Sequence, residues 1–491
     1  MQPAMTQTRG TPLVGKYPAA VALALLALCP FIVLSTATLL IPQQLTISLH
    51  TTTFGVNLSE ALSNAAYAFG AVVAADLILR VPKWATYVAC EAGFVVGSLL
   101  CVAAPGVIAF TVGRTVQGMA TGMLLVVALP PLVTAHGVRR LPLTAAFVNL
   151  GLFGMVTLGP VVGGLAGSYF DWRWLFAAVA VAGVTGLVVG LLGFERTAAA
   201  SPGIGFDKSA IPVAACATTL PFLGVAWLSR GPVTSVGFVL PFVIGLAALA
   251  LLLVRQYRKD EALMPMRLIM HTLPVTGVGA AMVAGAGFTT LIELAATYLL
   301  RARHDPPGLV GGLLATQMAG IVVAAWMFKR VLTTRWLPAL TFAGLGLVAV
   351  GGGVLLLLGS GFDAATVAIA GLLLGFGAGA GVAPGLFMGG LSVPSNRLGP
   401  TFALVELLRS EAAFMVAPVL MYVALLAPHL LSGVRLAAFV TTAFVVVSWL
   451  VLLGLLLLGG TRPHAPDLAG WIDGDSPAYH SPPLAGAVRD T

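Results

Sequence analysis

Six charged residues interrupt otherwise apolar stretches of this 491-residue sequence, and their side chains could carry chemistry in nonpolar surroundings. They are Glu91, Arg114, Glu293, Glu406, Arg409 and Glu411. Burial shifts a carboxyl group toward its neutral form and a nearby cation shifts it back, so such a group can bind and release a proton. The set therefore predicts proton binding rather than bond cleavage.

The sequence contains no recognisable catalytic or metal-binding pattern. Its seven histidines have no metal-ligand spacing and no hydrolytic partner residues. The cysteines Cys29, Cys90, Cys101 and Cys216 form no Cys-x-x-Cys pair and are expected to be small buried side chains. We expect no enzyme activity, no metal and no cofactor. A phosphate-binding Gly-x-x-x-x-Gly-Lys loop is missing too, so a proton gradient is the expected energy source rather than ATP.

The elements that hold the six charged residues must be membrane helices. Apolar residues make up 59% of the chain and charged residues only 9%, whereas a soluble domain is typically about 25% charged. The fold class that remains is an all-helical, polytopic membrane protein. The net charge of +8 fits basic residues gathered in cytoplasmic loops, so we expect no nucleic-acid partner.

Fourteen apolar stretches approach or exceed the roughly 20 residues that a membrane-spanning helix needs. With the N-terminus inside, 18 basic residues fall in inside segments and five in outside segments. This bias predicts a multi-pass protein of the cell membrane with both termini in the cytoplasm. The predicted helices are 19–42, 59–79, 84–104, 107–134, 142–168, 173–193, 210–229, 235–254, 272–299, 309–328, 337–358, 364–390, 399–426 and 434–458.

The helices divide the chain into five predicted parts. These are a cytoplasmic N-terminal segment (1–18), a six-helix bundle (19–193), two extra membrane helices (194–271), a second six-helix bundle (272–458) and a disordered cytoplasmic tail (459–491). The tail is predicted to be disordered because it is short, polar and rich in proline.

The predicted fourth helix contains the motif Arg114-Thr-Val-Gln117-Gly118, and Gly122 follows four residues later. A charge in hydrocarbon is costly, so an arginine at this depth usually faces a cavity or a partner. Glycines spaced by four allow two helices to pack closely. The alternative is a structural arginine bonded to a neighbouring carbonyl group.

The predicted fifth helix contains Gly159-Pro160-Val-Val-Gly163-Gly164. Proline removes one helical hydrogen bond and bends the helix, and the glycines let another backbone approach. The segment is therefore predicted to be a pivot or a seal. An ordinary glycine-rich membrane helix is the alternative.

Together, the two motifs resemble the fourth- and fifth-helix signatures of the major facilitator superfamily, and the latter is typical of its drug–proton antiporters. The segment Asp171-Trp-Arg173-Trp-Leu-Phe176 is also similar to that family. Fourteen helices in a 6+2+6 order resemble its fourteen-helix multidrug exporter branch. The resemblance implies two six-helix bundles related by a pseudo-two-fold axis, with substrate bound between them and alternating access.

The sequence departs from the family pattern in two places. Of the usual motif after the second helix, only Asp76 and Arg80 remain, and the resemblance implies a gating role for Asp76. A solvated interfacial charge is the alternative. The first helix contains Phe31-Ile-Val-Leu-Ser35-Thr36 but not the usual acid, so a first-helix carboxylate cannot be the proton site.

Glu293 is our first candidate for the proton-coupling group and Glu411 the second, with Arg114 as the cation that either would attract. Glu406 and Arg409 are three residues apart on one helical face and are predicted to form a structural ion pair. Glu411 points away from that face. A carboxyl group satisfied by neighbouring hydroxyl or carbonyl groups is the alternative for each candidate.

The substrate cavity is expected to be mainly apolar, because the chain has too few charges to bind a highly charged compound. Lipophilic or amphipathic cargo is therefore favoured. Most polar residues at cavity depth would otherwise serve in helix packing. Those that could line the cavity are Gln43, Asn64, Tyr67, Gln117, Asn149, Thr290 and Gln317.

These observations favour a secondary-active exporter that exchanges lipophilic or amphipathic small molecules for protons, working as a monomer among membrane lipids. The missing first-helix acid leaves open a proton-independent facilitator or lipid transporter of the same fold. A non-transporting membrane receptor is a third interpretation.

Overall fold

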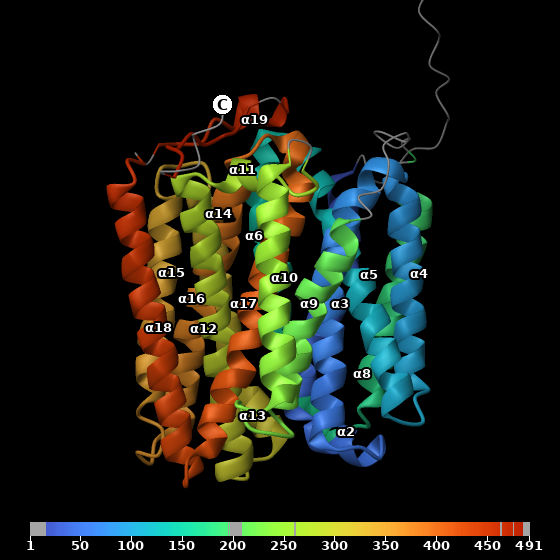
Figure 1. Cartoon of the computed structure of the whole chain (residues 1–491), viewed down its shortest axis with the longest axis vertical. Coiled ribbons are helices and arrows are strands. Elements are labelled where there is room, and N and C mark those ends of the chain that lie inside the picture. Colours follow the sequence, from blue (N-terminus) through green and yellow to red (C-terminus); the bar gives the residue numbers. More distant parts are fainter. Residues whose placement is uncertain are drawn as a thin grey trace, which may run out of the picture.

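The structure is a computed structural model that describes residues 16–194, 196, 209–259, 262–461, 464–474 and 476–484. Residues 1–15 of the predicted N-terminal segment lie outside the described residues. Fourteen helices in the described part of the chain are long and apolar enough to cross a membrane, which confirms the predicted fold class. They stand side by side as one bundle (Figure 1).

The N-terminal half contains six spans, several of which are broken into shorter helical pieces. The first four spans are α1 (Tyr17–Ala37) with η2 (Thr38–Leu40), α3 (Thr53–Arg80), α4 (Lys83–Val102) and α5 (Val107–Thr134). The fifth span consists of four consecutive pieces: η3 (Val138–Arg140), α6 (Leu141–Asn149), η4 (Leu150–Gly154) and α7 (Met155–Tyr169). The sixth span is α8 (Arg173–Gly193). The short helix α2 (Pro42–Ser48) follows the first span.

The C-terminal half contains six more spans. They are α12 (Thr272–Thr297) with η5 (Tyr298–Ala302), α13 (Pro307–Leu314) with α14 (Thr316–Val331), α15 (Leu337–Leu355), α16 (Asp363–Leu391), η6 (Ser395–Arg397) with α17 (Leu398–Leu426), and α18 (Leu430–Leu458). Two short helices, α11 (Met266–Ile269) and α19 (Leu468–Ile472), lie before and after this half in the chain.

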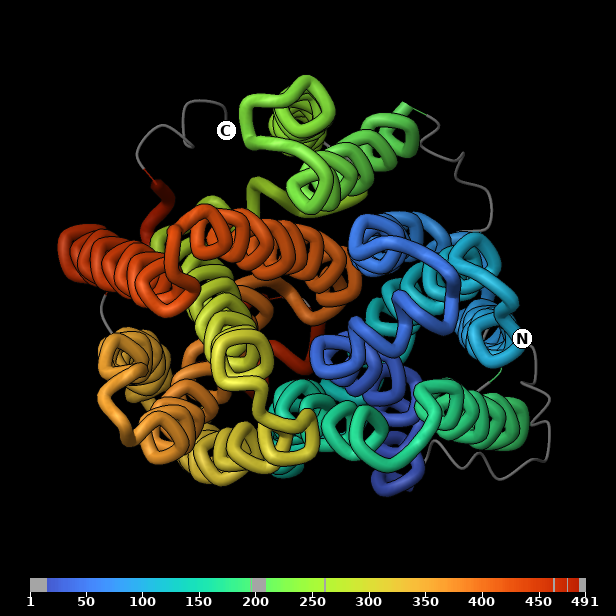
Figure 2. Tube along the Cα trace, turned by 90° about the horizontal axis from the view of Figure 1, so that it is seen from below, coloured from blue at the N-terminus to red at the C-terminus, as the bar shows by residue number. Residues whose placement is uncertain are grey.

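The two extra spans, α9 (Ala210–Trp227) and α10 (Val236–Arg258), lie together on one side of the bundle (Figure 2). There α9 contacts both α3 and α17, so it covers a junction between the two halves. The prediction of four buried cysteines is wrong for Cys216 on α9, which is exposed, whereas the other three are buried. An outward-facing position on a lipid-facing helix accepts the same small apolar side chain as the core does.

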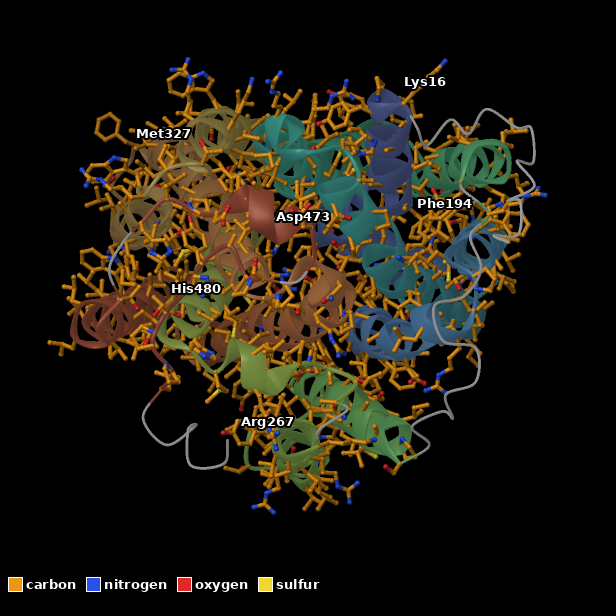
Figure 3. All side chains as sticks on the ribbon, turned by 90° about the horizontal axis from the view of Figure 1, so that it is seen from above. Lys16, Phe194, Arg267, Met327, Asp473 and His480 are labelled. Carbon is orange, nitrogen blue, oxygen red and sulfur yellow. The ribbon has the colours of Figure 1, made fainter. Side chains whose placement is uncertain are left out.

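Two ends of the bundle can be distinguished. Lys16 and the C-terminal segment with Asp473 and His480 lie at the upper end (Figure 3), which we call the termini face. The helix α2 lies at the lower end in Figure 1, which we call the far face.

Close backbone contact between α3 and α5 depends on glycine. A Cβ atom at Gly118 would collide with the carbonyl oxygen of Ser63, and one at Gly122 would collide with that of Tyr67. The predicted close packing at these two glycines is therefore confirmed. It brings the side chains of α3 within reach of Arg114.

The fifth span is interrupted by a π-helical stretch, η4, which the sequence did not predict. A π-helical turn contains one residue more than an α-helical turn and is often found at functional sites. The stretch ends five residues before Gly159, so the irregular turn and Pro160 lie close together in one span.

The prediction of a disordered tail after residue 459 is wrong for the segments 464–474 and 476–484. These residues fold back on the termini face, and α19 forms within them. The reason is a set of apolar side chains among the prolines: Trp471 is 1% exposed and Tyr479 is 3% exposed. Burial of such side chains offsets the entropy that ordering the segment costs.

The glycine contact generates a stability prediction. We expect Gly122→Leu to lower the free energy of unfolding by about 1–3 kcal/mol or more, because the added side chain forces α3 and α5 apart. Equilibrium unfolding in mixed micelles measures this change. Gly346→Leu on α15 is the matched control, since nothing lies within 4 Å of a Cβ atom there. Equal stability of the two variants would contradict the proposed role of Gly122.

Candidate functional site

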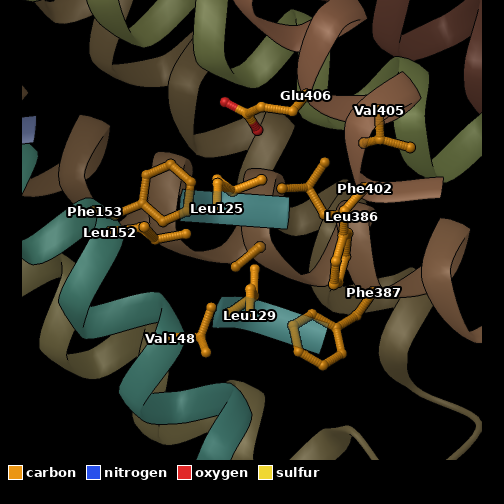
Figure 4. Close-up of a pocket in the computed structure, with 11 residues that line it drawn as sticks. Leu125, Leu129, Val148, Leu152, Phe153, Leu386, Phe387, Phe402, Val405 and Glu406 are labelled. Carbon is orange, nitrogen blue, oxygen red and sulfur yellow. The ribbon is translucent and has the colours of Figure 1, made fainter. Parts of the chain in front are cut away.

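A pocket lies between the two halves of the bundle (Figure 4). The N-terminal half contributes side chains from α5, α6 and η4, and the C-terminal half contributes side chains from α16 and α17. Its volume is about 20 Å³, little more than the roughly 10–15 Å³ that one water molecule needs. The lining residues are Leu125, Leu129, Val148, Leu152, Phe153, Ala383, Leu386, Phe387, Phe402, Val405 and Glu406.

Glu406 is the charged residue in this apolar lining, and its carboxylate connects the two halves. The hydroxyl group of Tyr67 on α3 donates to Glu406 Oε1 over 2.8 Å. Arg409, one turn further along α17, donates from Nε to both carboxylate oxygens over 3.0 and 3.1 Å. The structure therefore brings the predicted Glu406–Arg409 pair into contact, at the edge of the pocket rather than away from it.

Arg114 is completely buried inside the N-terminal half and is neutralised there. Its Nη2 donates to Glu60 Oε2 over 2.8 Å, and its Nη1 donates to Gln117 Oε1 over 3.1 Å. Gln117 in turn donates to Ser98 Oγ over 2.8 Å. This network satisfies a charge that would otherwise be very costly in the membrane.

The ring of Phe31 lies between the Arg114–Glu60 ion pair and Tyr67, the partner of Glu406. Phe31 on α1 stacks against Tyr67, with ring centroids 5.4 Å apart and an interplanar angle of 9°. The guanidinium carbon of Arg114 lies 5.3 Å from the centroid of the same Phe31 ring. Arg114 and Glu406 are thus linked through two adjoining aromatic side chains.

Glu60 is the residue that the sequence analysis missed. The second helix was predicted to begin at residue 59, which places Glu60 at a water-exposed helix end. In the structure α3 begins at Thr53, so Glu60 stands two turns inside the span. The signal that could have found it is the intramembrane arginine itself, which requires a carboxylate from another helix at similar depth.

The pairing of Arg114 with Glu293 or Glu411 that we considered is not what the structure contains, since Glu60 occupies that position. Glu293 is half-buried on α12, in the C-terminal half. Glu411 is buried on α17, and within the described part of the chain neither of its carboxylate oxygens has a hydrogen-bond partner. Both residues belong to the C-terminal half, whereas Arg114 contacts residues of its own half.

Asp76 and Arg80 form an ion pair at the termini-face end of α3. Asp76 is only 3% exposed, so the alternative of a solvated interfacial charge is wrong. The side chain lies beneath the surface because α3 continues to Arg80 before the chain turns toward α4.

The fifth-span motif lies where α7 meets helices of both halves near the far face. Thr36 of α1 donates to the carbonyl oxygen of Val156 over 2.9 Å. A Cβ atom at Gly163 would collide with the backbone of Ala37 in the same half. One at Gly164 would collide with the backbone of Pro307, which begins α13 in the other half. This tight contact at Gly159, Pro160, Gly163 and Gly164 agrees with a seal between the halves.

Among the predicted polar cavity residues, Tyr67 reaches the charged edge of the pocket, and the others serve elsewhere. Gln43 is exposed on α2, and Thr290 donates to the carbonyl oxygen of Ala286 within its own helix over 2.7 Å. Gln117 belongs to the Arg114 network. Asn64 is half-buried on α3 and Gln317 is buried on α14.

Asn149 forms another of the hydrogen bonds between the halves. Its Nδ2 donates to the carbonyl oxygen of Gly379 on α16 over 2.9 Å. The residue lies next to the pocket residue Val148 but does not line the pocket. None of the seven predicted polar residues lines this apolar pocket, and Tyr67 reaches it through Glu406.

No group of three or more His, Cys, Asp or Glu side chains in the described ranges could hold a metal ion. What the arrangement offers chemically is a carboxylate at an apolar pocket, bonded to a tyrosine hydroxyl from the opposite half.

The sequence profile of the Major Facilitator Superfamily matches residues 23–418. The chain belongs to this superfamily. The family and its named relatives indicate a membrane transporter and not an enzyme. The match runs from the first span through the two extra spans into α17, so the resemblance at the fourth and fifth helices extends over most of the chain.

Curated relatives match this transporter over part of their length. The chain is 26% identical over 260 residues to the multidrug resistance protein B homolog of Mycobacterium tuberculosis, which covers 52% of this chain and 48% of the relative. It is 29% identical over 269 residues to the uncharacterized MFS-type transporter YubD of Bacillus subtilis, with 52% and 51% covered. The chain thus spans about half the length of these relatives.

Solved structures with a similar fold cover nearly the whole chain. The peptide transporter POT in complex with sulfate has a TM-score of 0.63 at 17% identity, covering 92% of this chain and 96% of the other. The human organic anion transporter MFSD10 has a TM-score of 0.60 at 14% identity, covering 90% and 99%. At these identities the similarity concerns the fold.

The buried ion pair generates a second prediction. We expect Glu60→Ala to lower the free energy of unfolding by about 3–5 kcal/mol, because it leaves the buried guanidinium of Arg114 without its counter-charge. Asp171→Ala is the control, since its ion pair with Arg173 is largely exposed (34% and 54%) and contributes only about 1 kcal/mol. If unfolding in mixed micelles shows the same loss for both variants, Glu60 does not neutralise Arg114.

Proposed function

We propose that this transporter exports lipophilic or amphipathic small molecules across the cell membrane in exchange for protons, by alternating access. The observation that carries the proposal is the pocket between the halves, with apolar walls and the Glu406 carboxylate at its edge. Apolar walls suit lipophilic cargo. Because the pocket holds about one water molecule, the halves must separate to admit any cargo. A further relative, the probable multidrug-efflux transporter Rv1634 of Mycobacterium tuberculosis, is named for this direction of transport.

The termini face is the cytoplasmic face in this proposal. Basic residues are concentrated in the segments that lie at that end, as the positive-inside rule requires of cytoplasmic loops. The transporter works as a monomer surrounded by membrane lipids, since one chain supplies both halves of the pocket.

Proton coupling in this proposal centres on Glu406. A proton on its carboxylate would remove the charge that attracts Arg409 and would alter the bond to Tyr67 of the other half. A contact whose strength differs between two conformations shifts their equilibrium by that difference in free energy. Cationic cargo would compete with the proton for the same carboxylate, so the two would not be bound together.

The Arg114–Glu60 cluster extends this arrangement into the N-terminal half. Phe31 contacts both Arg114 and Tyr67, so movement of Tyr67 away from Glu406 would change the surroundings of Arg114. Glu293 and Glu411 remain candidates for the titrating group, because each is a carboxylate within a span of the C-terminal half.

Transport in proteoliposomes with an imposed pH gradient tests this assignment. We expect Glu406→Gln to reduce gradient-driven transport roughly tenfold or more, about 1.4 kcal/mol, because the amide keeps the shape of the side chain but cannot titrate. Asp363→Asn is the matched control: Asp363 is also a buried carboxylate that accepts from a tyrosine hydroxyl (Tyr298) and an arginine (Arg303), but it does not line the pocket.

The possible outcomes separate the candidates. Wild-type gradient-driven transport by Glu406→Gln would exclude this residue, and Glu293→Gln and Glu411→Gln then test the two earlier candidates. Wild-type rates in all three variants would reject the proton-coupling proposal for these residues.

A proton-independent facilitator or lipid transporter is the second candidate function. It is favoured by α1, in which no acidic residue occurs between Tyr17 and Ala37. For this function we expect cargo flux to be unchanged when a protonophore collapses the pH gradient. A fall in flux under the same conditions would reject it.

A further inference from the structure

The C-terminal residues 464–474 and 476–484, which we call the strap, are hydrogen-bonded to the C-terminal half. The indole Nε1 of Trp471 donates to the carbonyl oxygen of Val393 over 2.8 Å. The backbone N–H groups of Ala478 and Tyr479 both donate to the carbonyl oxygen of Leu391, over 2.8 and 3.1 Å. These bonds fasten the strap to the end of α16, where carbonyl groups would otherwise lack partners.

A second attachment lies at the start of α12. The N–H group of Thr272 donates to the carbonyl oxygen of Pro482 over 2.9 Å, and that of Leu484 donates to the carbonyl oxygen of Met270 over 3.2 Å. Leu273 also donates its N–H to Ser481 Oγ over 3.2 Å. The strap therefore joins the ends of two helices, α12 and α16, on one face of the C-terminal half.

The strap also reaches the other half of the molecule. Its helix α19 contacts η3, which begins the fifth span in the N-terminal half. Viewed onto the termini face, Asp473 at the end of α19 lies near the middle of the molecule (Figure 3). Seen from the far face, the red trace of the C-terminal segment is visible between the halves (Figure 2).

The strap lies next to the termini-face end of the pocket. Phe387 lines the pocket, and Leu391, which accepts the two strap bonds, follows it by one helical turn on α16. Phe402 also lines the pocket, about one turn from the start of α17, which lies at the termini face as the end of α16 does. The strap therefore lies over the termini-face end of the pocket and is bonded to the end of α16, which borders it.

We propose that the strap is a lid that closes the pocket on the termini face and must leave η3 before cargo can enter from that side. The inference rests on the proposed function in taking this face as the side of cargo uptake. The hydrogen bonds described for α19 and the residues after it go to the C-terminal half. Parting of the halves therefore separates α19 from η3, and the lid stays with α12 and α16.

Cysteine labelling of the pocket tests the lid without any transport measurement. Val405→Cys places a thiol of similar size in the pocket lining, in a chain that also carries Cys216→Ser to remove the exposed native thiol. The full-length protein is held in lipid nanodiscs, and the rate of reaction with a water-soluble, charged maleimide is measured. The same chain without Val405→Cys measures the background of the buried native cysteines.

We expect Trp471→Ala to increase the labelling rate about tenfold, which corresponds to about 1.4 kcal/mol of lost lid closure. Trp336→Ala is the matched control, since Trp336 also lies at the termini face but is 58% exposed and outside the strap. An unchanged rate in Trp471→Ala overturns the proposal and leaves the strap as a support of the C-terminal half.

A chain that ends at Gly460 provides a second variant if the Trp471→Ala protein is not recovered folded. It removes every strap contact, and the same increase in labelling is expected. Labelling needs neither cargo nor a proton gradient, so its result stands apart from that of the transport assay. Lost transport in Glu406→Gln with unchanged labelling in the strap variants would reject the lid and keep the proposed function.

Discussion

A charge that leaves water for the interior of a membrane bundle must be compensated by the protein, and this constraint organises the N-terminal half. Arg114 is compensated by Glu60 from a different helix. The carboxylate can reach the guanidinium because α3 and α5 touch backbone to backbone at Gly118 and Gly122. Thus the glycines and the ion pair depend on each other: a wider helix separation would leave a buried cation unpaired.

The helix α3 also connects the Arg114–Glu60 ion pair with the pocket. Glu60, Ser63 and Tyr67 are spaced by three and four residues, so they share one helical face. Ser63 donates to the backbone carbonyl of Arg114, and Tyr67 donates to Glu406 in the other half. One rigid helix therefore carries the partner of the buried arginine and the hydroxyl group that holds the pocket carboxylate.

Much of the fold could be predicted from the sequence, because it depends on patterns that are local in the chain. The number of spans follows from apolar length, the Glu406–Arg409 contact follows from a spacing of three, and the α3–α5 contact follows from Gly118 and Gly122. Glu60 could not be assigned from its own surroundings, since its depth depends on where α3 begins. The strap was missed because its apolar residues are buried only against distant helix ends.

Two of the polar cavity candidates form contacts within the bundle that the sequence could not specify. Asn149 and Gln117 stand at suitable depth, but depth along a helix does not say which neighbour the side chain meets. Asn149 meets a carbonyl group of α16, and Gln117 meets Arg114. Only the three-dimensional packing distinguishes a side chain that faces cargo from one that joins two helices.

The π-helical turn in the fifth span sets the relative orientation of that span's two ends. One additional residue rotates everything after it by about 100° relative to an uninterrupted α-helix. Asn149, before the turn, faces Gly379, while Gly163 and Gly164, after it, face α1 and α13. In a regular helix of the same sequence that kept the Asn149 bond, Gly163 and Gly164 would point about 100° away from these partners. The irregular turn thus lets Asn149 at one end of the span and Gly163 and Gly164 at the other contact different helices.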